Sequence, residues 1–260
     1  MEAAIKLEKL PWPEVAKVRD RCGGFLILPI GATEQHGPHL PINCDTVIAE
    51  SVCRYASGKS GVPILPSLAY TVSSGHTPKW PGTFSLRHDT FIATVQEIAT
   101  WAVATGWSKL LLVNSHFGND ASLRVAIEKI RLEFLGRLQI GLKGTFQLSD
   151  KIWEYFISDA DDLHANKAET DLLLHLTPET VRMDLVEDDP DRTGGTVFSY
   201  PVAQTSLNGI TGNPSLGDAA RGETLFTEMG DALAAFVETA KTEVPPLEAS
   251  YWSDLQPYHP

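Results

Sequence analysis

The sequence contains few cysteines and no long hydrophobic run. Its three cysteines, Cys22, Cys44 and Cys53, form no CxxC pair, and such a sparse, odd number indicates reduced thiols rather than a disulfide framework. No apolar stretch approaches the roughly 20 residues that span a bilayer. The opening MEAAIKLEKLPWPEV also lacks the basic-then-apolar pattern of a secretion signal. These absences predict a cytoplasmic protein that does not enter a membrane.

Basic residues are also scarce. The chain has 21 Lys and Arg against 33 Asp and Glu, a formal net charge of -12. Because an acidic chain repels phosphate groups, we expect no nucleic-acid partner and no binding to a membrane surface. With 43% hydrophobic residues, the 260-residue chain can bury a sizeable core. No segment marks a boundary, so we expect a single domain over residues 1–260.

Short continuous apolar runs, which are typical of buried strands, alternate along the chain with segments that have apolar residues at helical spacing. This alternation predicts an α/β fold with a mainly parallel sheet covered on both faces. The polar segment 187–213 is too long for an ordinary connection, which indicates a functional loop or an oligomer contact. The C-terminal YWSDLQPYHP is expected to pack on a surface or on a neighbouring subunit. We expect strands at 24–30, 62–70, 109–116 and 138–146, and helices at 46–57, 89–106, 121–135, 167–176 and 224–244.

Imidazole and carboxylate side chains follow the predicted strands. In open α/β sheets, ligands bind beyond the carboxyl ends of the strands. Glu34 and His36 are two residues apart in an extended segment, so both can face one site. The residues that we expect to gather at these strand ends are Glu34, His36, Asp45, His116, His164 and Glu169.

Each of these residues also has an ordinary structural interpretation. Asp45 could cap the N-terminus of the helix that it precedes. Glu169 could be an acid that the dipole of its helix stabilises, and His116 could be a hydrogen-bonded loop histidine. Together, however, they supply the nitrogen and oxygen donors that suit zinc, manganese or iron. Their joint position at the strand ends favours a metal centre, although spacing alone does not decide between the two interpretations.

Five blocks spread over most of the chain are distinctive: LPIGATEQHGPHLPINCD, GHTPKWPGTFSL, LLLVNSHFGN, HANKAET and GITGNPSLGDAARGE. In sequence and in order they resemble the creatininase (creatinine amidohydrolase) family. The resemblance implies a three-layer α/β/α fold and two divalent metal ions per subunit (zinc, manganese or iron). It also implies hydrolysis of a non-peptide C–N bond in a small molecule, often a cyclic amide, and a homo-oligomer, commonly a hexamer.

The resemblance also implies roles for individual residues. Glu34 and His116 would bind one metal ion, His36 would bind the other, and Asp45 would bridge the two. His164 matches the family's catalytic histidine, which moves a proton during the reaction. Creatinine-hydrolysing members carry a carboxylate ligand where this chain has Gly118. We expect Glu169 to take the place of that ligand.

Other matching positions suggest a reshaped pocket. Ser115 and Phe117 stand where glycines are common in the family, and no tryptophan lies in the four residues before His164. The missing tryptophan, like the missing carboxylate at Gly118, argues against creatinine as the substrate. We expect His76, Phe117 and Trp153 to contact the substrate.

His39 is expected to contact a metal ligand, rather than the metal ion, and to hold that ligand in position. Asn114 and Asn119 are expected to tie the loop of His116 by hydrogen bonds to backbone.

The sequence therefore predicts a metal-dependent amidohydrolase that cleaves a cyclic amide or a formamide with an activated water. Three alternatives stay open. One is trimming of a modified peptide. Another is ring-opening hydrolysis of a keto-inositol, which breaks a C–C bond at the same two metal ions. The third is a non-catalytic scaffold that keeps the fold.

Overall fold

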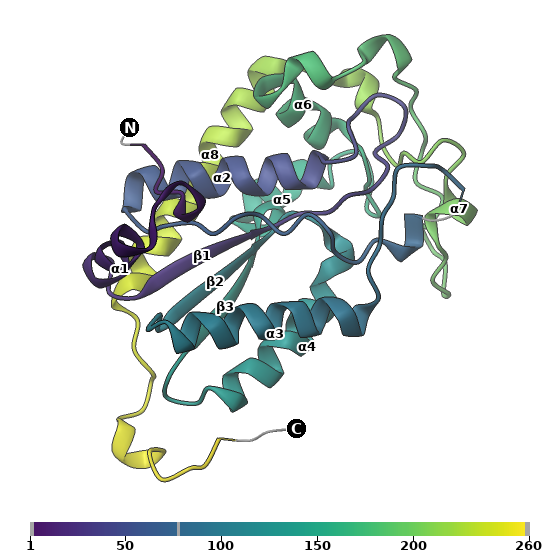
Figure 1. Ribbon diagram of the computed structural model, residues 1–260. Helices are drawn as coiled ribbons and strands as arrows, with labels where there is room; N and C mark the ends of the chain where they lie inside the picture. The colour runs from purple at the N-terminus through teal and green to yellow at the C-terminus, as the bar shows by residue number, and fades with distance from the viewer. Residues whose placement is uncertain (1–2, 77–78, 258–260) are drawn as a thin grey trace.

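The computed structural model describes residues 3–76 and 79–257 and has three layers, with helices on both faces of a parallel sheet (Figure 1). Helices α2, α6 and α8 cover one face, and α3 and α4 cover the other. The elements are α1 (Trp12–Arg21), β1 (Phe25–Ile30), α2 (Cys44–Ser60), α3 (His88–Ala104), β2 (Lys109–Asn114), α4 (Asp120–Glu133), β3 (Gln139–Gly144), α5 (Asp150–Phe156), α6 (Lys167–Leu176), α7 (Val202–Thr205) and α8 (Ala219–Thr242).

The sheet has the strand order β1-β2-β3, and both pairs are parallel. Phe25 pairs with Lys109 and Ile30 pairs with Asn114, so β1 and β2 end at the same level. On the other side of β2, Asn114 pairs with Gly144. The loops that follow the three strands therefore leave from one edge of the sheet.

Successive side chains of each strand point to opposite faces of the sheet, so the hydrophobic core has two parts. Ile27 and Val113 pack with α2, α6 and α8, whereas Leu28 and Leu112 pack with α3 and α4. Strands buried on both faces read as continuous apolar runs, which is how β1 and β2 appear in the sequence. The three-layer fold that we predicted is confirmed.

The predicted strand at 62–70 is wrong. This segment makes only single bridges, from Ile64 to Lys6 and Ile27 and from Leu68 to Ile30. Pro63 and Pro66 lack the N–H group that a ladder requires, so the segment runs beside β1 without becoming a strand. The other three strands are present, although β2 and β3 end two residues before the predicted boundaries.

The predicted helices are all present, and α6 has the predicted bounds, whereas the other four have shifted ends. Helix α2 begins at Cys44, two residues before the predicted start, and α8 begins at Ala219 rather than at residue 224. Segment 187–213 contains only the short α7. Residues 258–260 of the C-terminal tail lie outside the described residues. Within the described part of the chain, no helix is both long and apolar enough to cross a membrane.

Candidate metal centre

The loop after β1 carries the first two candidate ligands into the interior. Glu34 and His36 are both completely buried. The backbone N–H of Glu34 donates to the Ile42 carbonyl at 2.9 Å, and His36 forms an antiparallel bridge with Leu40. These contacts fold the loop back on itself, so that both side chains point into the sheet edge rather than to solvent.

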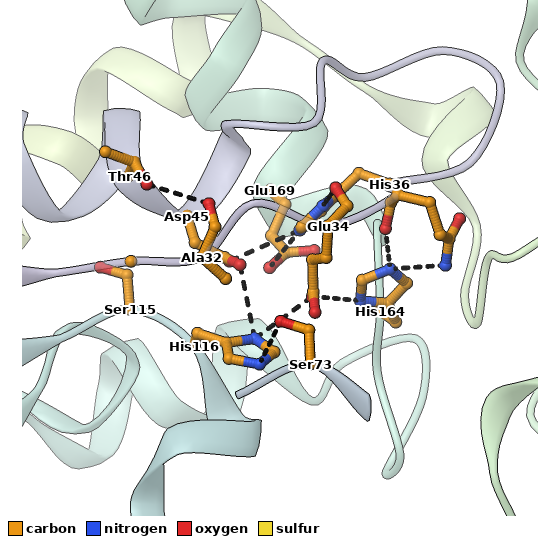
Figure 2. A network of polar contacts seen from close by, with 12 residues as sticks. Ala32, Glu34, His36, Asp45, Thr46, Ser73, Ser115, His116, His164 and Glu169 are labelled. Carbon is orange, nitrogen blue, oxygen red and sulfur yellow. Dashed lines mark hydrogen bonds and ion pairs between the residues drawn. The ribbon is translucent and has the colours of Figure 1, made fainter. Parts of the chain in front are cut away.

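Asp45 lies in the first turn of α2 and is buried. The N-cap of α2 is Asn43, so the capping role that the sequence left open for Asp45 is wrong. The helix begins two residues earlier than the apolar period indicates, which turns the Asp45 carboxylate toward the loop of Glu34 and His36 (Figure 2).

His116 follows β2 directly, and two asparagines hold its loop. Asn114 Nδ2 donates to the His116 carbonyl at 2.7 Å, and the His116 N–H donates to Asn114 Oδ1 at 3.2 Å. Asn119 Nδ2 donates to the Gly31 carbonyl at 3.0 Å, and Asn119 Oδ1 accepts from the Val72 N–H at 3.1 Å. These bonds join the loops that follow β1 and β2.

Gly118 leaves room for the His116 ring. A Cβ atom at position 118 would lie 2.4 Å from His116 Nε2 and 2.8 Å from the Val72 carbonyl oxygen. No side chain fits there while His116 keeps its hydrogen bond to Val72. The carboxylate that some family members carry at this position therefore has no space in this chain.

Glu34, His36, Asp45, His116 and Glu169 come together in one buried cluster (Figure 2). The closest approaches are 3.2 Å between His116 Nδ1 and Glu34 Oε1, 3.4 Å between His116 Nδ1 and Asp45 Oδ2, 3.4 Å between His36 Nε2 and Asp45 Oδ1, and 4.0 Å between His36 Nε2 and Glu169 Oε1.

Hydrogen bonds to backbone carbonyls determine which nitrogen of each ring faces the cluster. A carbonyl oxygen only accepts, so the nitrogen that contacts it carries the proton. His116 Nε2 lies 2.8 Å from the Val72 carbonyl, and His36 Nδ1 lies 3.1 Å from the Glu34 carbonyl. The opposite nitrogens, His116 Nδ1 and His36 Nε2, face the carboxylates, and each would offer its lone pair to a bound metal ion.

Unpartnered buried atoms concentrate in this cluster. Among the described residues, the buried side-chain polar atoms without a hydrogen-bond partner are Glu34 Oε1 and Oε2, His36 Nε2, Asp45 Oδ2 and Glu169 Oε2, together with His39 Nδ1 and Ser67 Oγ elsewhere. Buried polar atoms without partners are costly. Histidine nitrogens that face carboxylates across such short distances need positive charge between them, which either protons or metal ions can supply.

The donor set fits divalent cations. Zinc ligands lie about 2.0–2.2 Å from the ion in a tetrahedron, which places two of them roughly 3.4 Å apart. Two groups of donor atoms come within 4.8 Å of one another: Glu34 with Asp45 and His116, and His36 with Asp45 and Glu169. Asp45 belongs to both groups and offers a different oxygen to each histidine.

The charges of the cluster act on each other strongly. Burial alone would raise the pKa of Glu34, but His116, His76 and His164 together outweigh it and hold that pKa well below its usual range. Burial alone would lower the pKa of His116, but Glu34 and Asp45 raise it to about 9. Burial raises the pKa of Glu169 to about 7. Groups of this kind bind metal in competition with protons.

His164 enters the cluster from a segment with an unusual backbone. Ala165 has a φ of 49°, the left-handed region that non-glycine residues rarely adopt. Asn166 then caps α6 by accepting from the N–H groups of Ala168 and Glu169, and Asp159 accepts from Asn166 Nδ2 at 2.8 Å. This sharp entry into α6 aims both His164 and Glu169 at the cluster.

The two nitrogens of His164 have different partners. Nε2 lies 2.7 Å from the Gln35 carbonyl, so we infer that it carries the proton. Nδ1 lies 3.7 Å from Glu34 Oε1 and presents a lone pair. Burial lowers the pKa of His164 well below its usual range, and His76 and His36 act in the same direction. His164 also forms a third group of possible donors with Glu34 and His36.

The remaining predicted residues lie at different distances from the cluster. His76 Nε2 lies 3.8 Å from Glu34 Oε2. The ring of Phe117 stacks on Phe146, with centroids 3.8 Å apart, and Trp153 lies behind this pair. Trp153 does not line the cavity of the cluster, whereas His76 and Phe117 do.

Among the described residues, no hydrogen bond joins the His39 side chain to a candidate ligand. Its Nε2 lies 2.9 Å from Thr170 Oγ1, and that hydroxyl donates to the Asn166 carbonyl at 2.7 Å. His39 therefore connects the first loop to the start of α6. Burial lowers the pKa of His39 to about 4.

Gln35 is a site residue that the sequence reasoning missed. It is buried between Glu34 and His36, and its side chain contacts His76, His164 and the Gly209 carbonyl. A Cβ atom at position 209 would lie 2.1 Å from Gln35 Oε1. The quoted blocks TEQHG and GITGN contain both residues, but nothing in either block indicates that they meet.

One cavity opens on the cluster, and a second lies on the other side of Gln35. The first, of about 300 Å³, is lined by Glu34, Asp45, His116 and Glu169 together with Phe117, Asp162, Val202 and Thr211. The other, of about 540 Å³, is lined by Gln35, Trp80 and residues 184–187 among others. The Gln35 side chain stands at the junction, since its amide contacts two histidines of the first cavity.

Known proteins match the chain over most of its length. A family model described as creatinine amidohydrolase matches residues 8–237. The mycofactocin precursor peptide peptidase of Mycobacterium ulcerans (strain Agy99) is 33% identical over 226 residues, which covers 79% of this chain and 81% of the relative. The creatinine amidohydrolase of Pseudomonas putida is 27% identical over 266 residues, which covers 95% of this chain and 100% of the relative.

Solved structures match as well. The structure described as creatininase Mn has a TM-score of 0.81 and 25% sequence identity, and the match covers 92% of this chain and 100% of that chain. The structure described as creatinine amidohydrolase (creatininase) has a TM-score of 0.80 and 25% identity, covering 93% and 99%.

Proposed function

The chain belongs to the creatininase family of metal-dependent hydrolases, and from that premise we propose that it hydrolyses an amide C–N bond at a centre of two divalent metal ions. Glu34, Asp45 and His116 would hold one ion, and His36, Asp45 and Glu169 the other. Zinc, manganese and iron all suit these donors. This ligand set makes a non-catalytic scaffold the weaker interpretation.

One observation carries the proposal. His36 Nε2 and His116 Nδ1 face carboxylate oxygens at 3.2–4.0 Å inside a buried cluster. His36 Nε2, both oxygens of Glu34, Asp45 Oδ2 and Glu169 Oε2 have no hydrogen-bond partner. A bound metal ion would supply the positive charge that these facing nitrogen and oxygen atoms require. Bound divalent ions would supply Lewis acidity and would lower the pKa of a water molecule near them.

His164 is the residue that we assign to proton transfer. Its Nδ1 lone pair faces Glu34 inside the cavity, and its other nitrogen is held by the Gln35 carbonyl. The imidazole takes one proton from the attacking water as the water oxygen bonds to the amide carbon. It then gives this proton to the leaving nitrogen as the C–N bond breaks. The products are a carboxylic acid and an amine, and the imidazole returns to its starting state.

The two adjoining cavities support substrates larger than a single small ring. The acyl side would occupy the cavity of about 300 Å³, and a longer leaving group would extend past Gln35 into the cavity of about 540 Å³. A formamide, a cyclic amide or the end of a short peptide fits this description. A relative that acts as a precursor peptide peptidase supports the inclusion of peptides.

We further propose a cytoplasmic homo-oligomer. Segment 187–213 exposes Val197, Phe198 and Tyr200, with 90%, 74% and 47% of their surface accessible. Exposed apolar side chains of this size are typical of protein contacts. A hexamer is the expectation from the family resemblance.

The test is a substrate panel with protein that has been reconstituted with zinc, manganese or iron. It contains formamides, cyclic amides, short peptides and a keto-inositol. We expect turnover of an amide that a chelator abolishes and added metal restores. In the His164→Ala variant both ions should remain, while kcat falls by roughly 10²–10⁴. Turnover of the keto-inositol alone, or of nothing, would contradict amide hydrolysis.

A further inference from the structure

Gln35 connects two histidines of the cavity. Its Nε2 lies 3.1 Å from His76 Nδ1, 3.1 Å from His164 Nε2 and 3.0 Å from the Gly209 carbonyl oxygen. Its Oε1 accepts from the Gly37 N–H at 2.9 Å. Because a backbone N–H only donates, this last bond fixes which end of the amide is oxygen. The NH₂ group therefore faces the two imidazoles.

The hydrogen bonds around Gln35 have one consistent arrangement. His164 Nε2 donates to the Gln35 backbone carbonyl at 2.7 Å, so this nitrogen carries a proton and cannot accept. The Gly209 carbonyl can only accept, so it takes one of the two amide protons of Gln35. The other amide proton is left for His76 Nδ1.

This arrangement fixes the tautomer of His76. Since Nδ1 accepts a hydrogen bond, it carries no proton, and the proton of the neutral ring is on Nε2. That N–H points toward the ligand cluster, because Nε2 lies 3.8 Å from Glu34 Oε2. The rings of His76 and His164 have centroids 4.2 Å apart and line the same cavity. The cavity thus contains a donor from His76 beside an acceptor from His164.

We propose that His76 is a further catalytic residue whose Nε2–H donates to the carbonyl oxygen of the scissile amide, and that Gln35 is a positioning residue that holds this tautomer. The inference rests on the proposed amide hydrolysis. When the water oxygen bonds to the amide carbon, the π electrons of the C=O bond move onto its oxygen. His76 stabilises this charge without giving up its proton, and the C=O bond forms again as the C–N bond breaks.

The kinetic test compares His76→Leu with His76→Gln in the metal-loaded protein. Leu has no donor, whereas the Gln amide places an N–H group near the position of Nε2. We expect kcat of His76→Leu to fall by roughly 10²–10³ with KM little changed, and His76→Gln to recover part of the loss. A kcat within threefold of the parent protein in His76→Leu would overturn the catalytic role. Loss of metal ions from that variant would also overturn the catalytic role, because it would show that His76 has a structural role.

A spectroscopic test needs no substrate and no variant of His76. Long-range ¹H–¹⁵N spectra of the zinc-loaded, histidine-labelled protein show which nitrogen of each ring is protonated. We expect His76 to carry its proton on Nε2. In Gln35→Glu, the carboxylate accepts from His76 Nδ1, so the proton should move to Nδ1. The exposed Gln147→Glu is the matched control and should change nothing.

A proton on Nδ1 of His76 in the parent protein would overturn the assigned tautomer. An unmoved proton in Gln35→Glu would overturn the role of Gln35. If the parent protein hydrolyses no amide, the proposed reaction fails and the catalytic role of His76 fails with it. The spectra still report the tautomer in that case, so the two failures are distinguishable.

Discussion

The Nε2 atom of His36 lies 4.0 Å from Oε1 of Glu169, and both side chains are buried. His36 comes from the loop after β1, whereas Glu169 comes from the first turn of α6. The capping of α6 by Asn166 turns the Glu169 carboxylate inward. Glu169 thus lies beside His36, as the proposed second metal site requires, whereas a side chain at position 118 would collide with the His116 ring.

The first prediction concerns Glu169→Gln. The substitution keeps the size of the side chain but removes its charge. We expect the variant to lose one of two metal ions and nearly all turnover while the fold is retained. Elemental analysis with circular dichroism measures both quantities. The exposed Glu179→Gln serves as the control. Two ions in Glu169→Gln would remove Glu169 from the ligand set.

The second prediction concerns Asp45→Asn. Because the two oxygens of Asp45 face different histidines, the variant should lose affinity for both ions. Its metal-free form should fold, since Asp45 does not cap α2. Metal titration with thermal unfolding of the metal-free protein tests this. Asp89→Asn, an exposed acid in the first turn of α3, controls for helix-dipole effects. Unchanged affinity at either site would contradict a bridging role.

The third prediction concerns Gly118→Ala. The added methyl group would lie 2.4 Å from His116 Nε2, so the ring must move and lose its bond to Val72. We expect selective loss of the ion that we propose Glu34, Asp45 and His116 to hold. Gly194→Ala has open space around the new methyl group and is the matched control. Normal binding of two ions in Gly118→Ala would show that the His116 ring is not confined in this way.

The fourth prediction concerns Asp189, whose hydrogen bonds hold the beginning and the end of segment 187–213 together. Its carboxylate accepts from Arg192 Nη2 at 2.6 Å, Ser206 Oγ at 2.8 Å and the Leu207 N–H at 2.8 Å. Burial alone would raise the pKa of Asp189, but these donors lower it below its usual value. The pKa of Asp189 is therefore lower in the folded protein than in the unfolded chain, where it is about 4. At a pH between these two values the unfolded chain binds more protons. The stabilisation that ionised Asp189 provides is therefore present above about pH 4 and is lost as the pH falls through the folded-state pKa.

Asp189→Asn should therefore lower the free energy of unfolding by about 1–3 kcal/mol at neutral pH. It should also reduce the steepness with which stability falls below about pH 4. Denaturant unfolding at a series of pH values measures both effects, with the exposed Asp254→Asn as a control. A pH profile parallel to that of the parent protein would show that Asp189 is not the group responsible.

Much of the fold was predictable because burial on both faces leaves a simple pattern. The runs FLILPI and KLLLVN became β1 and β2, and their shared edge brought Glu34 and His116 together. The run at 62–70 is also largely apolar, but Pro63 and Pro66 remove ladder hydrogen bonds. An apolar run alone does not distinguish a strand from an extended segment beside one.

The finer arrangement of the site was not predictable from residue types. The pairing of Gln35 with Gly209 depends on a close approach between loops that are distant in the sequence. The direction of each imidazole depends on which backbone carbonyl it meets, such as Val72 for His116. Sequence patterns identify which side chains reach a site, whereas these contacts determine which atom of each one faces it.

The most direct test of the account is anomalous X-ray diffraction from crystals of the zinc-loaded protein, recorded on both sides of the zinc absorption edge. We predict two zinc peaks per chain. One should lie among Glu34, Asp45 and His116, and the other among His36, Asp45 and Glu169, with an Asp45 oxygen bound to each. A single peak, or a second peak away from Glu169, would contradict the two-metal centre from which the proposed chemistry follows.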